Sequence, residues 1–284
     1  GRLATVTQGP RTRSTTYFNT SDSRNGYVQW VTNALGQTTS FSPDATGRIL
    51  QQLDPDGALT SFAWDGNSNL TSVTPPGQPA HGQSFTPVDL LSAYTPPSVP
   101  GVPVPSTLFA YNLDKQLTQT TRPDGLLVGR TYDSAGKLDL LTTPAGNVDY
   151  DYFGLTPCPG CAPGRLQRIT DPSGVVLDHA YDGLLLKSLT WSGAVSGTVS
   201  FGHDASFRVT SETVTVGANT SSVAFGLDND DLLICASPST CSPAGTDALK
   251  ITLNAGNGLG TGSTHGLVTD TLTYNVFGEL ASTT

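Results

Sequence analysis

The side chains best suited to covalent or metal chemistry are four cysteines in two local pairs, Cys158/Cys161 and Cys235/Cys241. The stretch Cys158-Pro159-Gly160-Cys161 has the spacing of zinc and redox sites, whereas Cys235 and Cys241 are poorly spaced for zinc. An even number of cysteines in short loops also suits disulfides in an oxidising compartment. We therefore favour structural disulfides or free loop thiols, with zinc binding and redox chemistry as alternatives.

Other groups that could support catalysis are few. None of the four histidines (His81, His179, His203, His265) has metal-ligand spacing. The chain has only two glutamates, Glu212 and Glu279, and most aspartates lie in turn-like sequences, which leaves few candidates for general acid–base chemistry. The run Asp228-Asn229-Asp230-Asp231 could hold calcium, but its spacing is not that of an EF-hand, so a solvated turn is favoured. The sequence predicts no enzyme and no cofactor.

Composition narrows the class of protein. The chain has 284 residues and a formal net charge of −9, which argues against nucleic-acid binding because phosphate recognition needs a basic surface. Only 13% of residues are charged, while Gly (31) and Pro (20) are abundant, and this balance favours strands with frequent turns. No apolar run approaches the ~18 residues that span a bilayer. Because Met is absent, Gly1 is expected to be a processed N-terminus or the start of a fragment.

A repeated pattern runs through the chain. Each copy has an anchor residue, then Asp or Asn at the next position, and an aliphatic residue six positions after the anchor. The anchors are Pro43, Trp64, Tyr111, Tyr132, His203, Leu227 and Tyr274. The polar residues are Asp44, Asp65, Asn112, Asp133, Asp204, Asp228 and Asn275, and the aliphatic ones are Ile49, Leu70, Leu117, Leu138, Val209, Leu233 and Leu280. Five copies have Phe two residues before the anchor: Phe41, Phe62, Phe109, Phe201 and Phe225.

A second turn signal alternates with the first. Asp54-Pro55-Asp56-Gly57 and Arg122-Pro123-Asp124-Gly125 are typical, because Pro presets φ at the second turn position and Gly suits the fourth. Two alternating turns leave strands of about six residues and repeat units of about 23 residues. The Phe and the anchor lie two apart and share a sheet face. We expect these Phe residues and the aliphatic positions to be buried, so that Phe→Ala would cost about 3–5 kcal/mol.

These residues resemble the YD (Rhs) repeat family, whose unit has Tyr-Asp, then Gly, a basic or polar residue and Leu. Tyr132-Asp133-Ser134-Ala135-Gly136-Lys137-Leu138 is a full copy. Partial copies are Asp44 to Ile49 with Gly47, Tyr274-Asn275 with Gly278, and Tyr181-Asp182-Gly183. The resemblance covers roughly residues 30–284 and implies a spiral antiparallel sheet that forms a hollow shell.

The predicted architecture is an all-β repeat fold, a spiral antiparallel β-solenoid or shell with on the order of 25 strands, because a flat open sheet rarely exceeds ~10 strands. Residues 1–284 are expected to form one repeat segment, with irregular insertions at 75–106, which is rich in Pro, and at 235–266, which is rich in Gly and Ser. Neither end has an obvious capping unit, so we expect a fragment of a longer chain.

The leading functional hypothesis is a non-enzymatic scaffold within a large secreted or cell-surface protein. Members of the resembled family, such as Rhs polymorphic toxins and Tc-toxin C components, enclose a toxin, and teneurins mediate cell-surface contact, so the resemblance implies a toxin-enclosing cage in the parent chain. The alternative is an extracellular fibre or adhesin built by stacking repeats through strand edges. A glycan-binding module, with Trp30, Trp64 or Trp191 stacking on sugars, is less favoured. Expected partners are other parts of the parent chain, identical copies, an enclosed toxin domain or surface glycans.

Overall fold

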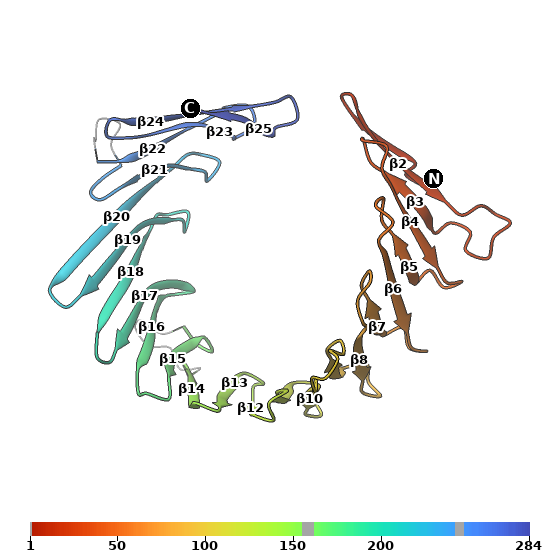
Figure 1. Cartoon of the computed structure of the whole chain (residues 1–284). Helices are drawn as coiled ribbons and strands as arrows, with labels where there is room; N and C mark the ends of the chain where they lie inside the picture. Colours follow the sequence, from red (N-terminus) through yellow and green to blue (C-terminus); the bar gives the residue numbers. More distant parts are fainter. Residues whose placement is uncertain (1, 155–161, 242–246) are drawn as a thin grey trace. The chain divides into compact units, whose positions relative to one another are not determined.

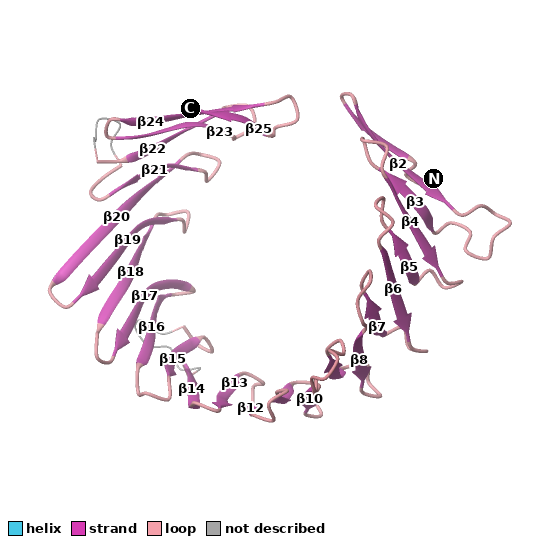
Figure 2. Ribbon diagram, in the orientation of Figure 1, coloured by secondary structure: helices cyan, strands magenta, loops and turns pink. Residues whose placement is uncertain are grey.

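The computed structural model describes residues 2–154, 162–241 and 247–284, which form strands and turns with no helix in those ranges (Figures 1 and 2). The predicted all-β repeat fold is confirmed. The first strands are β1 (Thr5–Gln8), β2 (Arg11–Tyr17), β3 (Val28–Thr32), β4 (Thr38–Pro43), β5 (Ile49–Leu53), β6 (Leu59–Trp64), β7 (Leu70–Thr74), β8 (His81–Phe85), β9 (Leu91–Thr95), β10 (Thr107–Tyr111), β11 (Leu117–Thr121) and β12 (Leu127–Tyr132). The remaining strands are β13 (Leu138–Thr143), β14 (Gly146–Tyr152), β15 (Leu166–Thr170), β16 (Val176–Asp182), β17 (Leu185–Ser192), β18 (Gly197–His203), β19 (Val209–Val216), β20 (Asn219–Leu227), β21 (Leu233–Ser237), β22 (Leu249–Leu253), β23 (Gly260–His265), β24 (Val268–Tyr274) and β25 (Leu280–Thr283).

The chain divides into two compact units, one made of Gly1–Thr131 with Thr142–Pro144 and the other of Tyr132–Leu141 with Ala145–Thr284. In the first unit each strand from β1 to β12 pairs antiparallel with the next one. In the second unit the same holds from β14 to β25. Each unit is therefore a meander, in which sequence neighbours are also spatial neighbours.

The two segments expected to be irregular insertions are more regular than the sequence indicates. Residues 75–106 contain β8 and β9, so that apart from the short connections at 75–80 and 86–90 only the stretch after Thr95 lacks a strand. Residues 235–266 contain the end of β21 and all of β22 and β23. The expectation fails at β8 and β9 because their copy of the repeat has Phe85 as anchor and Thr86 where other copies have Asp or Asn. The expected single segment over 1–284 stays a prediction.

The expected burial of the repeat's apolar residues holds in part. Each repeat Phe is less exposed than a surface residue but not fully buried: Phe41, Phe62, Phe109, Phe201 and Phe225. At the aliphatic position Val209, Leu233 and Leu280 are exposed, Leu280 by 55%. Within each unit the strands contact only their sequence neighbours, so among the described residues no second layer covers a sheet face. The few buried apolar residues are Phe18, Ala162, Tyr181, Cys235 and Ala248.

Candidate functional site: the repeated turns and anchors

The Asp or Asn after each anchor organises the turn that follows. Asp44 Oδ1 accepts hydrogen bonds from the backbone N–H groups of Thr46 (2.8 Å) and Arg48 (3.1 Å). The backbone closes the same loop, since Asp44 N–H donates to the Arg48 carbonyl (2.8 Å) and Gly47 N–H donates to the Asp44 carbonyl (3.1 Å). Side-chain oxygens at this position satisfy turn donors that the ladder leaves unpaired. The same side-chain bonds form at Asp65, Asp133, Asp204, Asp228 and Asn275, and Asn112 accepts from Gln116 N–H.

These bonds stabilise the ionised form of the turn aspartates. The Thr46 hydroxyl and the Arg48 guanidinium and N–H hold the pKa of Asp44 well below its usual range, despite partial desolvation. The pKa of Asp65 is lowered chiefly by the Asn69 side chain, and the pKa of Asp204 chiefly by the Arg208 backbone N–H. The pKa of Asp133 is lowered by the Lys137 backbone N–H. Because hydrogen bonds favour the charged carboxylate, the turns are strongest when these groups are ionised.

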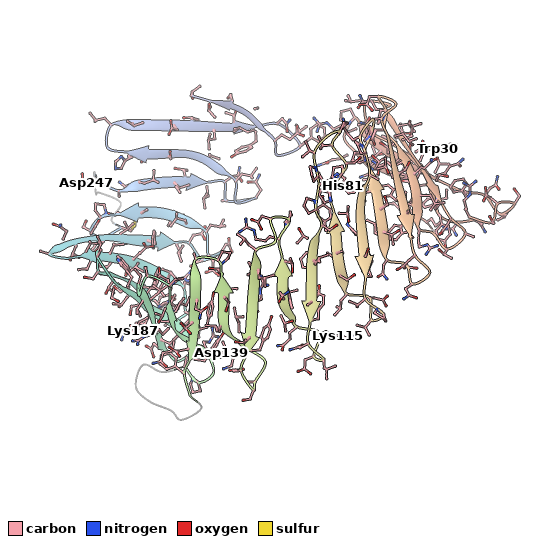
Figure 3. All side chains as sticks on the ribbon, turned by 60° about the horizontal axis from the view of Figure 1, so that its bottom comes forward. Trp30, His81, Lys115, Asp139, Lys187 and Asp247 are labelled. Atoms are coloured by element: carbon pink, nitrogen blue, oxygen red, sulfur yellow. A yellow bond between two sulfur atoms is a disulfide. The ribbon has the colours of Figure 1, made fainter. Side chains whose placement is uncertain are left out.

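The fourth residue after the anchor adopts a left-handed conformation. Gly fills this position in three copies, as Gly47, Gly136 and Gly278, with φ of 91°, 77° and 77°. In the other copies an ordinary residue takes it, and these are all the non-glycine residues with positive φ in the described ranges: Ser68, Asp89, Lys115, Phe207 and Asp231. Figure 3 shows one of them, Lys115, at the turn between β10 and β11. Phe207 is also 71% exposed.

Most anchors sit at a shift in strand register. The register shifts between Ser42 and Pro43, between Ala63 and Trp64, and between Ala110 and Tyr111, so one extra residue stands on the partner strand. The same shift occurs at Tyr17, Phe85, Tyr152, Tyr181, His203, Leu227, Leu253 and Tyr274. Sequence reasoning missed Tyr17, Phe85, Tyr152 and Leu253 as anchors. A search for an aromatic residue at the end of each predicted strand would have found the first three.

The polar tips of five aromatic anchors donate a hydrogen bond to the preceding repeat. Trp64 Nε1 donates to the carbonyl of Ile49 (2.8 Å), and Tyr111 Oη donates to that of Leu91 (2.9 Å). In each case the acceptor is the residue paired with the preceding anchor. The same link joins Tyr17 to Leu3, Tyr152 to Leu138 and Tyr181 to Leu166.

A basic residue five positions after the anchor makes the opposite link, to the following repeat. Arg48 Nε donates to Asp44 Oδ2 (2.7 Å), and its Nη1 donates to the Asp65 carbonyl (2.9 Å). Arg208 does the same with Asp204 and the Asp228 carbonyl (3.0 Å). Lys137 Nζ donates to the Gly164 carbonyl (3.3 Å) and lies 4.2 Å from the Tyr152 ring centroid. Anchors and basic residues thus connect successive repeats in both directions.

The copy at Tyr181-Asp182 follows this scheme only in part. Tyr181 is buried, with 7% of its surface exposed, and Phe153 packs edge-on against its ring. Asp182, however, pairs with Leu185 at the end of a shorter hairpin and is exposed. The degenerate copy at Tyr181 therefore keeps the anchor without the aspartate turn.

One cysteine pair is linked. Cys235 and Cys241 form a disulfide with a Cα–Cα distance of 5.8 Å. It lies over β20 at Gly226, where an added Cβ would stand 3.1 Å from the Cβ of Cys235. Cys158 and Cys161 lie outside the described residues, so the choice between disulfide, zinc and redox chemistry there stays open.

The remaining candidate groups are held in local structure. Asp228 Oδ1 accepts backbone bonds in its own turn, and Asp231 Oδ1 accepts from Arg208 Nη1 (2.8 Å). In the part of the chain that the structure describes, no three His, Cys, Asp or Glu side chains are grouped to hold a metal ion. His81 Nδ1 is 2.7 Å from Tyr94 Oη, and both lie on neighbouring strands. Of the tryptophans, Trp64 is engaged as an anchor and Trp30 is 38% exposed on β3.

The residues that the structure describes include no helix that is long and apolar enough to cross a membrane.

Charge is distributed unevenly over the sheet. From β3 to β11, nine successive strands contain no Asp, Glu, Lys or Arg. The charged side chains of this part of the chain lie in the turns, where Asp44, Arg48 and Asp65 are found. Both sheet faces are therefore formally uncharged over these strands, apart from the titratable His81.

A sheet of repeated two-strand units, linked through anchors and turns, is the architecture of a β-shell protein. The sequence profile of the Teneurin YD-shell family matches residues 1–230, and the chain belongs to this family. No curated protein sequence matches the chain.

Solved structures show the same fold. One, described as the crystal structure of TcdB2-TccC3-Cdc42, is 13% identical with a TM-score of 0.51, and the match covers 96% of this chain. Another, the Tc holotoxin pore of Photorhabdus luminescens with a TccC3 D651A mutation, is 12% identical with a TM-score of 0.50 and the same coverage. The chain spans only 17% and 20% of those two chains.

Proposed function

We propose that the chain is one stretch of the wall of a secreted or surface-exposed shell, formed by a longer parent protein around a toxin domain of that parent. The turn and anchor residues serve this function by fixing the spacing of successive strands. One of the solved structures that share the fold is a holotoxin pore by its description, which supports the proposal by analogy.

The observation that carries the proposal is the uncharged sheet from β3 to β11. A protein domain held inside a shell places backbone and apolar groups against the wall. Contact with a charged wall would bury unpaired charge, which is strongly unfavourable, whereas Ser, Thr and aromatic side chains avoid that cost. With the charges confined to turns, a broad area of the wall can touch an enclosed chain.

The experiment begins with the parent gene and its purified native product. We expect the reading frame to continue into a separate domain, and electron microscopy to show discrete closed particles. Limited proteolysis should leave that domain intact within the particle and degrade the same domain once it is expressed alone. The proposal would be contradicted by a reading frame with no further domain, by uniform filaments, or by equally fast digestion of the domain in both samples. Uniform filaments would favour the alternative of an extracellular fibre.

A further inference from the structure

The pairing between the neighbouring strands β21 and β22 is short and leaves one end of each strand unpaired (Figure 1). The paired residues are Cys235 with Lys250 and Ala236 with Leu249. From there both strands continue toward their anchor turns without pairing to each other. A cavity of about 520 Å³ lies at these unpaired ends, and we call it the β21–β22 cavity.

This junction has neither of the side chains that link other successive repeats. The anchor on β22 is Leu253, which has no hydroxyl or indole N–H to donate to the preceding repeat. Leu232 stands five positions after an anchor, where Arg48 and Arg208 donate to the following repeat in other copies. Two hydrogen-bonding side chains are thus replaced by aliphatic ones, and both leucines line the cavity.

The lining of the β21–β22 cavity is mainly apolar. Its apolar groups include Leu232, Ile234, Ile251, Leu253 and the disulfide between Cys235 and Cys241. Leu232 and Ile234 are 37% and 36% exposed, so solvent reaches this apolar surface. The carboxylates of Asp228 and Asp230 also line the cavity and can accept hydrogen bonds. A volume in the range of about 300–1,000 Å³, an apolar lining and a few polar groups are typical of small-molecule sites.

Other repeats show what occupies the equivalent place. Between β5 and β6 the pairing ends at Gln51 and Ser61. The indole of Trp64 then reaches across the unpaired ends to the Ile49 carbonyl. The phenol ring of Tyr111 spans the unpaired ends of β9 and β10 in the same way. The group that is missing between β21 and β22 is therefore an aromatic ring with one hydrogen-bond donor.

We propose that the β21–β22 cavity binds a small aromatic molecule with one N–H or O–H donor, of the indole or phenol class. The ring takes the place of the missing anchor ring among the leucine and isoleucine side chains, and the donor bonds to a carboxylate of Asp228 or Asp230. Removal of apolar surface from water drives the binding. The cavity lies within the second unit, so the inference does not depend on the shell function.

The test is a titration of the ¹⁵N-labelled whole chain with indole, followed by NMR. Indole should cause saturable shifts of the amide signals of Ile234 and Ile251 and leave those of β16 to β18 unchanged. Leu253→Tyr places an aromatic anchor in the cavity and should weaken indole binding at least tenfold. The matched control is Phe85→Tyr, which also creates a tyrosine anchor but in the first unit, and it should leave the affinity for indole unchanged.

Circular dichroism and thermal melting are recorded for each variant to show that it is folded. If Leu253→Tyr does not fold, Leu232→Arg takes its place, because it brings a longer, charged side chain to the same cavity and should weaken indole binding as strongly. Phenol should bind more tightly than cyclohexanol, which carries the same donor on an aliphatic ring. The proposal is overturned if indole causes no saturable shifts, if the shifts lie away from β21 and β22, if the folded cavity variant binds indole as the wild-type chain does, or if cyclohexanol binds as tightly as phenol.

Discussion

The left-handed position of the anchor turns is occupied by residues of very different suitability. Gly47, Gly136 and Gly278 adopt positive φ without steric strain, whereas Lys115 and Phe207 bring a Cβ into close contact with the backbone. The repeat therefore retains local strain in several copies. Since the same turn forms with or without glycine, the Asx hydrogen bonds and strand pairing are sufficient to impose it.

Replacing Lys115 with glycine should relieve this strain. We expect Lys115→Gly to raise the free energy of unfolding by about 0.5–1 kcal/mol, less whatever glycine adds to the flexibility of the unfolded chain. Urea denaturation monitored by circular dichroism measures the change. The control is Asp114→Gly, one residue earlier in the same turn and at negative φ, which should be neutral or destabilising. Equal effects of the two variants would contradict the strain argument.

The turn aspartates also predict how stability depends on pH. The pKa values of the turn aspartates are lowered in the folded chain, as at Asp44, Asp65, Asp133 and Asp204. In the unfolded chain the pKa of an aspartate is near 4. The unfolded chain therefore binds more protons at acidic pH, so stability should be constant above about pH 5 and fall progressively below about pH 4. Urea midpoints from pH 7 to pH 2 give the profile.

A variant tests whether the turns cause the acid sensitivity. Asp44→Asn should fold, because Asn112 and Asn275 occupy the same position in other copies. Its stability should be lower at pH 7, where the ion pair with Arg48 is lost, and should fall less steeply on acidification. A profile parallel to that of the wild-type chain would assign the acid transition to other groups.

At the scale of the element, the strands are held in series by two kinds of side chain. Anchor tips bind the preceding repeat, as Tyr111 does at Leu91, and basic residues bind the following one, as Arg48 does at Asp65. These links add to the backbone ladder, and they fix the spacing between hairpins. A repeat with Phe or Leu as its anchor, such as the repeat at Phe85 or Leu227, lacks the hydroxyl or indole donor and relies on the backbone hydrogen bonds between strands.

The link can be removed with little change in shape. Tyr111→Phe deletes the hydroxyl and leaves the Leu91 carbonyl without that donor, so it should lower the free energy of unfolding by about 0.5–1.5 kcal/mol. Tyr152→Phe and Tyr181→Phe should have effects of the same sign in the second unit. Chemical denaturation measures all three, and unchanged midpoints would mean that water replaces the link without loss.

The sequence predicts the turns well and the packing poorly. Asp44 and Gly47 identify their turn because the chemistry of that turn is local, involving bonds over two to four residues. The copy at Phe85 is missed because Thr86 takes the place of Asp, although its Oγ1 accepts from Leu90 N–H (3.1 Å) in the same manner. The links between repeats span fifteen to twenty residues in cases such as Trp64 and Tyr111, and periodicity alone does not show them.

For the whole molecule, the decisive property is that strands within each unit contact only their sequence neighbours. Without a second layer, the Phe residues of the repeat are half-buried, and the sequence could not show this because periodicity marks a shared face and not what covers it. Stability in such a chain is approximately a sum of unit and nearest-neighbour terms.

This arrangement predicts that damage stays local. Phe62→Ala should lower stability by about 1–2 kcal/mol, less than for a fully buried Phe, because part of the side chain already meets water. Hydrogen–deuterium exchange should accelerate in β5, β6 and β7 and stay unchanged in β18 and β19. The matched variant Phe201→Ala should reverse that pattern, and a uniform increase in exchange for either variant would contradict it.

The pairing of each strand with the one just before it also bears on how the chain is made. During synthesis a ribosome adds about 5–20 residues per second, whereas a β-hairpin closes in about 1–10 μs. A strand such as β6 finds β5 already exposed when it emerges, and it needs nothing that is still to be translated. The protein can therefore assemble in the order of its message, each new strand pairing with the edge left by the one before it.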